Sequence, residues 1–267
     1  MKKTIISCVL FLTAVTAFSQ TPMKTAAEAK LSASDLAVKI ADRILATTTY
    51  EFKNTKTGKT YKSVKNLPLD MNVKVACKYN NWHYTNGVTH IALMELADKT
   101  GAKKYDDYVL KNMNFVFNEG NLDFFKKQYE QAMKNEGWYG VRKLSWHMIF
   151  RGKRLDDNGP MGASLIDLQI KHPNNSFLNY INETAEHLNY GEPRLADGTI
   201  ARIWPHENTI WADDAFMAIS FLARMAKMTG DMSYINDAAN QVIKYHKYLW
   251  CCLLYTSPSP RDTERSR

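Results

Sequence analysis

The sequence predicts an all-α protein built from helical hairpins. Three segments, 86–116, 162–188 and 215–249, each hold two helical apolar patterns separated by a short break. In each segment an aromatic residue opens the second pattern. The segment 215–228 is apolar around most of its girth, as in a buried inner helix. Repeated hairpins without strand-like alternation indicate an α-solenoid or an α/α toroid.

The two ends of the chain differ from the part between them. Residues 1–19 have a charged start, an apolar run and a small-x-small ending, so we expect a signal peptide and export to the periplasm or the cell exterior. Residues 251–267 lose the helical period and become polar and basic, so we exclude them from the native domain. Residues 20–250 are expected to form one domain.

Charge and cysteine content exclude several classes of protein. The formal net charge is +8, but its lysines and arginines form no dense cluster of the kind that nucleic-acid binding needs. Cys77 is the single cysteine in residues 20–250, which excludes a disulfide framework and a cysteine metal site. The histidines lack zinc-site spacings, and no later stretch is long enough to span a membrane. We therefore expect no metal, cofactor, nucleic acid or membrane partner; the oligomeric state stays open.

The segments outside the hairpins are less regular. Residues 36–44 have a helical apolar face and follow a run of capping residues. Residues 48–80 are polar with turn signals, and we expect a long ordered loop there, although 50–52 and 73–75 could pair as strands. Residues 122–133 are helical in pattern, and the segment from there to residue 153 has no clear assignment.

Aromatic and acidic residues gather where the first helix of each hairpin begins. These residues are Trp82, His83 and Tyr84; Asp156 and Asp157; and Trp211, Asp213 and Asp214. In a toroid the inner helices run parallel, so these three starts share one rim. Helix capping would account for one carboxylate of each pair but not for the second. Carboxylates perform acid/base work and indoles stack on sugar rings, so the rim is typical of a sugar site.

Three motifs occur in the order of a known family. They are Trp82-His83-Tyr84-x-x-Gly87, Leu155-Asp156-Asp157-x-x-Pro160-x-Gly162 and Trp211-x-Asp213-Asp214-x-Phe216-Met217. Over about residues 80–249 the chain resembles the unsaturated glucuronyl and rhamnogalacturonyl hydrolases, glycoside hydrolase families 88 and 105, and family 105 more closely. The resemblance implies an (α/α)6 barrel. Because about four of six hairpins are visible, we expect a C-terminally truncated barrel without the downstream substrate-binding residues.

The resemblance also implies a reaction and a set of residues. The family removes a terminal Δ4,5-unsaturated uronate from oligosaccharides by hydrating the C4=C5 vinyl ether. The general acid/base would be Asp213, and Asp157 would be the assisting carboxylate, with Asp156 as the competing choice. We expect Asp213 to be buried beside Trp211 and thereby to hold its proton.

Other residues are candidates for substrate contact. The residues expected to contact substrate are Trp82, Tyr84, Asp156, His206 and Trp211. Each aromatic residue has a core role as its alternative, and a loop histidine such as His206 is more often structural. His206 and Arg202 precede the third inner helix and are candidates for binding the uronate carboxylate.

Two other functions stay open at this point. One is a conventional glycosidase or a polysaccharide lyase on the same toroid, with Asp157 and Asp213 as the acid/base pair. The other is a helical-repeat scaffold that binds carbohydrate without catalysis. Either enzyme requires Asp213 and Asp157 (or Asp156) to face one cavity with their carboxyl groups within about 10 Å.

Overall fold

The computed structural model describes residues 32–152 and 154–250. The chain divides into two compact units, residues 1–43 and 44–267, and helix α2 (Ala33–Thr47) crosses the boundary. The predicted signal peptide and the tail from residue 251 lie outside the described residues. The features that follow belong to the second unit.

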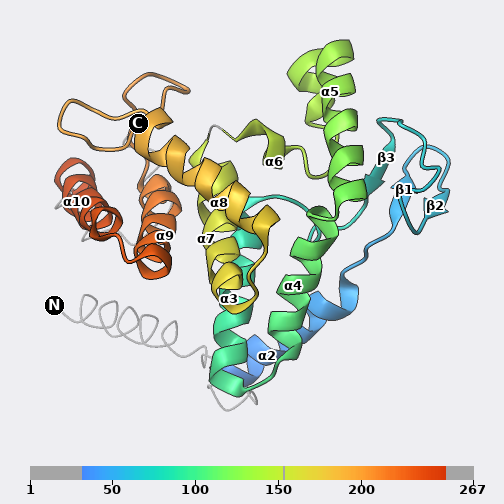
Figure 1. Ribbon diagram of the computed structural model, residues 1–267, viewed down its shortest axis with the longest axis horizontal. Helices are drawn as coiled ribbons and strands as arrows, with labels where there is room; N and C mark the ends of the chain where they lie inside the picture. Colours follow the sequence, from blue (N-terminus) through green and yellow to red (C-terminus); the bar gives the residue numbers. More distant parts are fainter. Residues whose placement is uncertain (1–31, 153, 251–267) are drawn as a thin grey trace, which may run out of the picture. The chain divides into compact units, whose positions relative to one another are not determined.

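The second unit contains the three hairpins that the sequence predicts. They are α3 (Tyr84–Thr100) with α4 (Lys104–Val116), α7 (Leu155–Lys171) with α8 (Asn175–Glu186), and α9 (Ala212–Thr229) with α10 (Met232–Leu249). The first helices pack together, with α7 between α3 and α9 (Figure 1). A one-turn π-helix, η2 (His187–Gly191), extends α8. The predicted all-α class, a partial barrel of helical hairpins, is confirmed.

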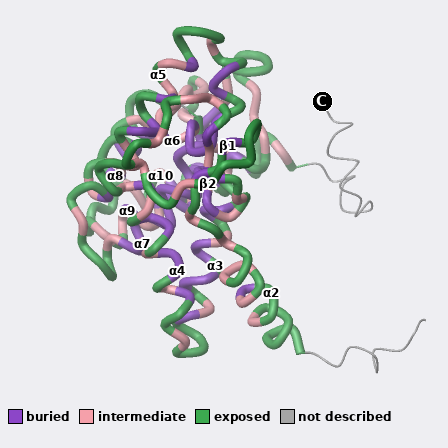
Figure 2. Tube along the Cα trace, turned by 90° about the vertical axis from the view of Figure 1, so that its right-hand side faces the viewer, coloured by how far each residue is buried: buried purple, intermediate pink, exposed green. Residues whose placement is uncertain are grey.

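Burial separates inner helices from outer ones. In α7 every residue from Asp157 to Ile166 is buried, whereas α10 buries only Ala238, Gln241 and Tyr245 (Figure 2). A helix that packs on several sides loses its polar face, and an outer helix keeps one. The second turn of α7 is therefore the centre of the inner layer.

Two glycines bring the inner helices into close contact. A Cβ atom on Gly159 of α7 would lie 2.3 Å from the carbonyl oxygen of Met217 in α9. A Cβ atom on Gly87 of α3 would lie 2.4 Å from the carbonyl carbon of Pro160 in α7. Neither neighbour can move aside, because both are backbone atoms. The absence of a side chain at these two positions thus sets the spacing of α3, α7 and α9.

A small sheet occupies the segment for which we expected a loop. Strands β1 (Phe52–Asn54), β2 (Thr60–Tyr61) and β3 (Val73–Val75) pair antiparallel in the order β2-β1-β3, with Phe52 opposite both Tyr61 and Val75. The loop prediction for residues 48–80 was therefore wrong. The strands are too short to show alternation in sequence, and their stability comes from packing on another element.

That element is α5 (Glu119–Val141), which includes the predicted helix 122–133 and bends at Gly137. The Gln128 side-chain amide donates to the carbonyl oxygens of Asp70 and Val73, both at 2.7 Å. Phe52 contacts the rings of Phe124 and Phe125. A short helix, α6 (Met148–Arg151), then leads to α7. The sheet is thus fixed by contacts that are distant in sequence.

We predict that Gly159→Ala destabilises the fold by about 1–3 kcal/mol, the usual cost of overpacking. The added methyl group can be placed only if α7 and α9 separate. Gly120→Ala is the matched control, because its Cβ atom would meet the movable side chain of Val64 at 3.3 Å. Urea unfolding of both variants measures the difference. A Gly159→Ala variant as stable as Gly120→Ala would contradict the proposed contact.

Candidate active site

One arginine joins the beginnings of α7 and α9. Nε and Nη2 of Arg202 donate to the two carboxylate oxygens of Asp214 at 2.5 and 2.6 Å. The same Nη2 lies 3.4 Å from Oδ1 of Asp156 and 3.7 Å from Oδ2 of Asp213. Three carboxylates from two helices therefore surround one guanidinium group.

The position of Arg202 depends on the outer helix α10. Arg202 and Thr209 exchange two backbone hydrogen bonds, at 2.8 and 3.2 Å, across a wide turn formed by residues 203–208. Just before this turn, the Ile200 N–H donates to Oε1 of Gln241 at 2.9 Å, and Tyr245 Oη donates to the Ile200 carbonyl at 3.2 Å. Gln241 and Tyr245 are both buried in α10. The segment that carries the arginine is thus fixed at both sides of residue 202.

The two aspartates of α9 have different surroundings. The Asp214 side chain is 1% exposed, and burial raises its pKa to about 6 although Arg202 opposes the shift. The Asp213 side chain is 51% exposed, so the expectation that Asp213 is buried was wrong. Consecutive helical residues point about 100° apart, and at this helix start Asp214 faces the core while Asp213 faces outward. Trp211 is the N-cap residue, and no side chain caps this helix.

The two aspartates of α7 divide in the same way. Asp157 is fully buried, both its carboxylate oxygens accept hydrogen bonds from Arg151, and burial raises its pKa against the effect of that arginine. The side chain of Asp156 is 27% exposed and shares Arg202 with Asp213. The competing choice, Asp156, is therefore the carboxylate that the structure brings to Asp213.

The predicted aromatic contacts have different outcomes. Trp82 is fully buried against Phe117, Trp146 and Tyr180, and its Nε1 donates to the Asp157 carbonyl at 2.7 Å. Its predicted contact with substrate was wrong, because an indole inside the core cannot stack on a ligand. It supports the α7 start instead.

The three remaining predicted contact residues lie at or near the surface. The Trp211 ring lies 4.1 Å from the Arg202 guanidinium carbon and orients that group. Tyr84 is 36% exposed, and its ring stacks at 4.5 Å on that of His83. His206 is exposed in the turn after Arg202, where its carbonyl accepts from the Thr209 hydroxyl. A substrate contact by any of these stays a prediction.

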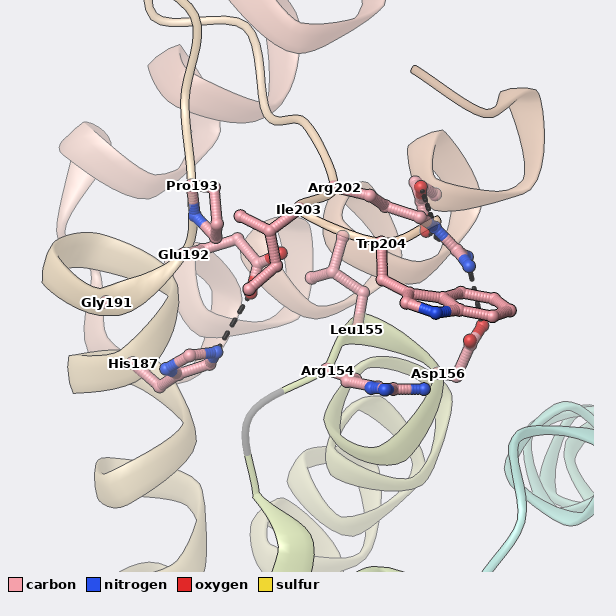
Figure 3. A pocket seen from close by; sticks show the side chains of 11 residues that line it. Arg154, Leu155, Asp156, His187, Gly191, Glu192, Pro193, Arg202, Ile203 and Trp204 are labelled. Carbon is pink, nitrogen blue, oxygen red and sulfur yellow. Dashed lines mark hydrogen bonds and ion pairs between the residues drawn. The ribbon is translucent and has the colours of Figure 1, made fainter. Parts of the chain in front are cut away.

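A pocket of about 180 Å³ lies beside the arginine cluster (Figure 3). Of the predicted carboxylates, Asp156 lines this pocket, whereas Asp213 and Asp157 are not among its lining residues. The wall also includes Asp214 and Arg202, together with residues that sequence reasoning missed: Arg154, His187, Glu192 and Trp204. His187 Nε2 lies 2.9 Å from Oε2 of Glu192. Arg154 lies two residues before the Asp156–Asp157 pair, and this proximity in sequence could have identified it as a candidate site residue. His187 and Glu192 carried none, because only η2 and the turn after it bring them to the pocket.

The described part of the chain does not meet the requirements of a three-ligand metal site or of a membrane-spanning helix. In residues 32–152 and 154–250, no three histidine, cysteine, aspartate or glutamate side chains gather as metal ligands would. Among the helices of that same part of the chain, none combines the length and apolarity that a membrane crossing requires.

We predict that Arg202→Met destabilises the protein by about 3–5 kcal/mol at about pH 7.5, because it leaves the buried Asp214 charge without a partner. Without Arg202 the raised pKa of Asp214 rises further, so the folded state binds a proton that the unfolded state does not. The loss in the free energy of unfolding, relative to the wild-type protein, should therefore be smaller at about pH 5 and should grow as pH rises. Urea unfolding at the two pH values measures it.

Two controls accompany this test. Arg202→Met/Asp214→Asn removes both charges and should recover most of the stability. Arg224→Met breaks the more exposed pair with Asp167, at 2.6 Å, and should cost less with little pH dependence. A loss in Arg202→Met that does not change with pH would contradict the role given to Asp214.

Comparisons with known proteins identify the family of the chain. The family model described as Glycosyl Hydrolase Family 88 matches residues 56–253, and no curated protein sequence matches the chain. Two solved structures are described as possible members of the GH105 family. The one from Klebsiella pneumoniae has a TM-score of 0.47 and 12% identity, covering 82% of this chain and 48% of that one. The one from Salmonella enterica has a TM-score of 0.49 and 14% sequence identity, and the match covers 81% of this chain and 49% of that one. The chain thus spans about half their length. Because the family model matches most of the sequence, the chain belongs to glycosyl hydrolase family 88.

Proposed function

We propose that the protein removes a terminal Δ4,5-unsaturated uronate from oligosaccharides by hydrating the C4=C5 double bond. The observation that carries this proposal is the meeting of Asp156 and Asp213 at one nitrogen of Arg202, beside a pocket that Asp156, Arg202 and Trp204 line. Membership of a glycoside hydrolase family supports a carbohydrate substrate. The predicted signal peptide would place the reaction in the periplasm or outside the cell.

The proposed reaction needs one proton donor and one water. Asp213 gives its proton to C4, and positive charge develops at C5 and the ring oxygen. A water molecule then adds its oxygen to C5 and returns a proton to the Asp213 carboxylate. The resulting hemiketal opens to a ketone, and the exposed C1 hemiacetal releases the rest of the oligosaccharide. Asp156 is the second carboxylate and stabilises the developing positive charge.

The surroundings of the four aspartates support this choice. Asp157 and Asp214 are buried, and an arginine binds both oxygens of each. A carboxylate held in this way keeps some acceptor capacity, but its arginine fixes its position and stabilises its charged form. Asp213 touches Arg202 only at 3.7 Å and is half exposed, so its carboxyl group can reach a ligand. Arg202 limits the repulsion between Asp213 and Asp156 and fixes where they stand.

We predict that Asp213→Asn lowers turnover by at least about 10²-fold, the usual scale of a lost general acid. Asparagine keeps the shape of the side chain but cannot supply the proton. Folding and substrate binding should survive, because the group is half exposed and makes only one long ion pair. The assay follows the loss of ultraviolet absorbance of an unsaturated disaccharide.

The saturated disaccharide is the control for the reaction type. Hydration requires the double bond, so the wild-type protein should leave the saturated compound uncleaved. Cleavage of both compounds at comparable rates would favour a conventional glycosidase. Near-normal turnover by Asp213→Asn would remove this residue from the chemistry.

We further predict that the two aspartates of α7 respond differently to substitution. Asp156→Asn should reduce turnover while the protein stays folded. Asp157→Asn should cost about 3–5 kcal/mol of stability, because Arg151 is then left unpaired against the core. Urea unfolding and the ultraviolet assay, applied to both variants, separate the two effects. An Asp157→Asn protein with full stability and no turnover would return the second catalytic role to Asp157.

A further inference from the structure

We infer, resting on the proposed function, that Arg154 recognises the carboxylate of the sugar in the pocket and that Trp204 holds its guanidinium in place. Neither residue belongs to the three sequence motifs. Both line the pocket next to Asp156, as Figure 3 shows. Charge pairing, position and chemistry each support this role.

Within the described residues, each ionisable side chain that lines the pocket contacts a polar partner side chain, except Arg154. Glu192 pairs with His187 at 2.9 Å, and Arg202 gives two hydrogen bonds to Asp214. Within the described residues, no carboxylate makes a direct ion pair with the Arg154 guanidinium group, which acts on Asp157 only through its charge. An acidic ligand that enters this pocket therefore meets Arg154 as the cation whose hydrogen-bond donors are open to it.

The position of Arg154 directs this cation into the pocket. Its guanidinium carbon lies 5.7 Å from the ring centroid of Trp204, which is 60% exposed on the turn after Arg202. A cation–π contact orients the guanidinium through its face and uses none of its N–H donors. Trp204 is therefore a positioning residue, and the N–H donors of the Arg154 guanidinium group stay available to a ligand.

The chemistry of an unsaturated uronate matches this arrangement. A planar guanidinium group binds a carboxylate through two parallel hydrogen bonds. The uronate carboxyl group is attached to C5, and C4 is the next ring atom. A carboxylate on Arg154 would therefore place the C4=C5 bond near Asp156 and Arg202, which line the same pocket, and thus near the cluster that contains Asp213. A neutral sugar would lack this anchor.

The test compares an unsaturated uronyl disaccharide with its methyl ester, which has the same double bond but no charge. The intrinsic reactivities of acid and ester differ, but that difference is common to all variants and cancels when their kcat/KM ratios are compared. Arg154→Gln should lower the acid-over-ester ratio about 10- to 100-fold, the scale of a lost charge-assisted pair. Arg154→Lys keeps the positive charge but cannot make two parallel hydrogen bonds, so its acid-over-ester ratio should lie between those of the wild-type protein and Arg154→Gln. Arg142→Gln, at an exposed arginine after α5, is the matched control and should keep the wild-type ratio.

Trp204 variants test the positioning role. Trp204→Ala should lower the same ratio, and Trp204→Phe should restore much of it, because a phenyl face still supports a guanidinium group. Calorimetric binding of both compounds to Asp213→Asn protein, with and without Arg154→Gln, gives a readout that does not need turnover.

Each outcome decides between the two proposals. An unchanged ratio in Arg154→Gln, or an equal loss for acid and ester, overturns the role of Arg154 and leaves the proposed reaction intact. If the wild-type protein does not convert the disaccharide but binds the acid through Arg154, the proposed reaction fails and the recognition role stands. Failure to bind either compound overturns both.

Discussion

The arrangement of the site depends on one buried ion pair, that of Arg202 with Asp214. A carboxylate that is 1% exposed is stable at neutral pH only if a cation and good hydrogen bonds replace its water. Arg202 supplies both, and its remaining contacts reach Asp156 and Asp213. The same guanidinium group thus connects α7 with α9 and sets the distance between the two exposed carboxylates.

The position of this ion pair depends on contacts within the inner helices and on contacts with the outer helix α10. The inner helices are close enough to share an arginine because Gly159 lets the α7 backbone meet Met217 of α9. From the outside, Gln241 and Tyr245 of α10 hold the backbone at Ile200, two residues before the arginine. An outer helix that contributes no residue to the pocket therefore determines where its central cation stands.

The two Asp–Asp pairs follow one pattern. In each, the second aspartate is buried and bound by an arginine, Asp157 by Arg151 and Asp214 by Arg202. The first aspartate, Asp156 or Asp213, is turned by about 100° and reaches the surface. One member of each pair thus holds a buried ion pair at the helix start, and the other is the one to which we assign a role in the proposed reaction. The buried and the exposed position of each doublet place the two carboxylates in opposite environments.

The sequence by itself determined the hairpins, since the helical period of apolar residues is a local property, and it located the acidic helix starts through motifs that lie within a few residues of one another. It also placed Asp213 and Asp156 among the candidates. Only the tertiary structure decided that Asp156 shares Arg202 with Asp213, that Trp82 is core, and that residues 52–75 form a sheet on α5. Each of these depends on which side of an element meets a partner distant in the chain. Arg154 and Trp204, 50 positions apart in the sequence, become neighbours for the same reason.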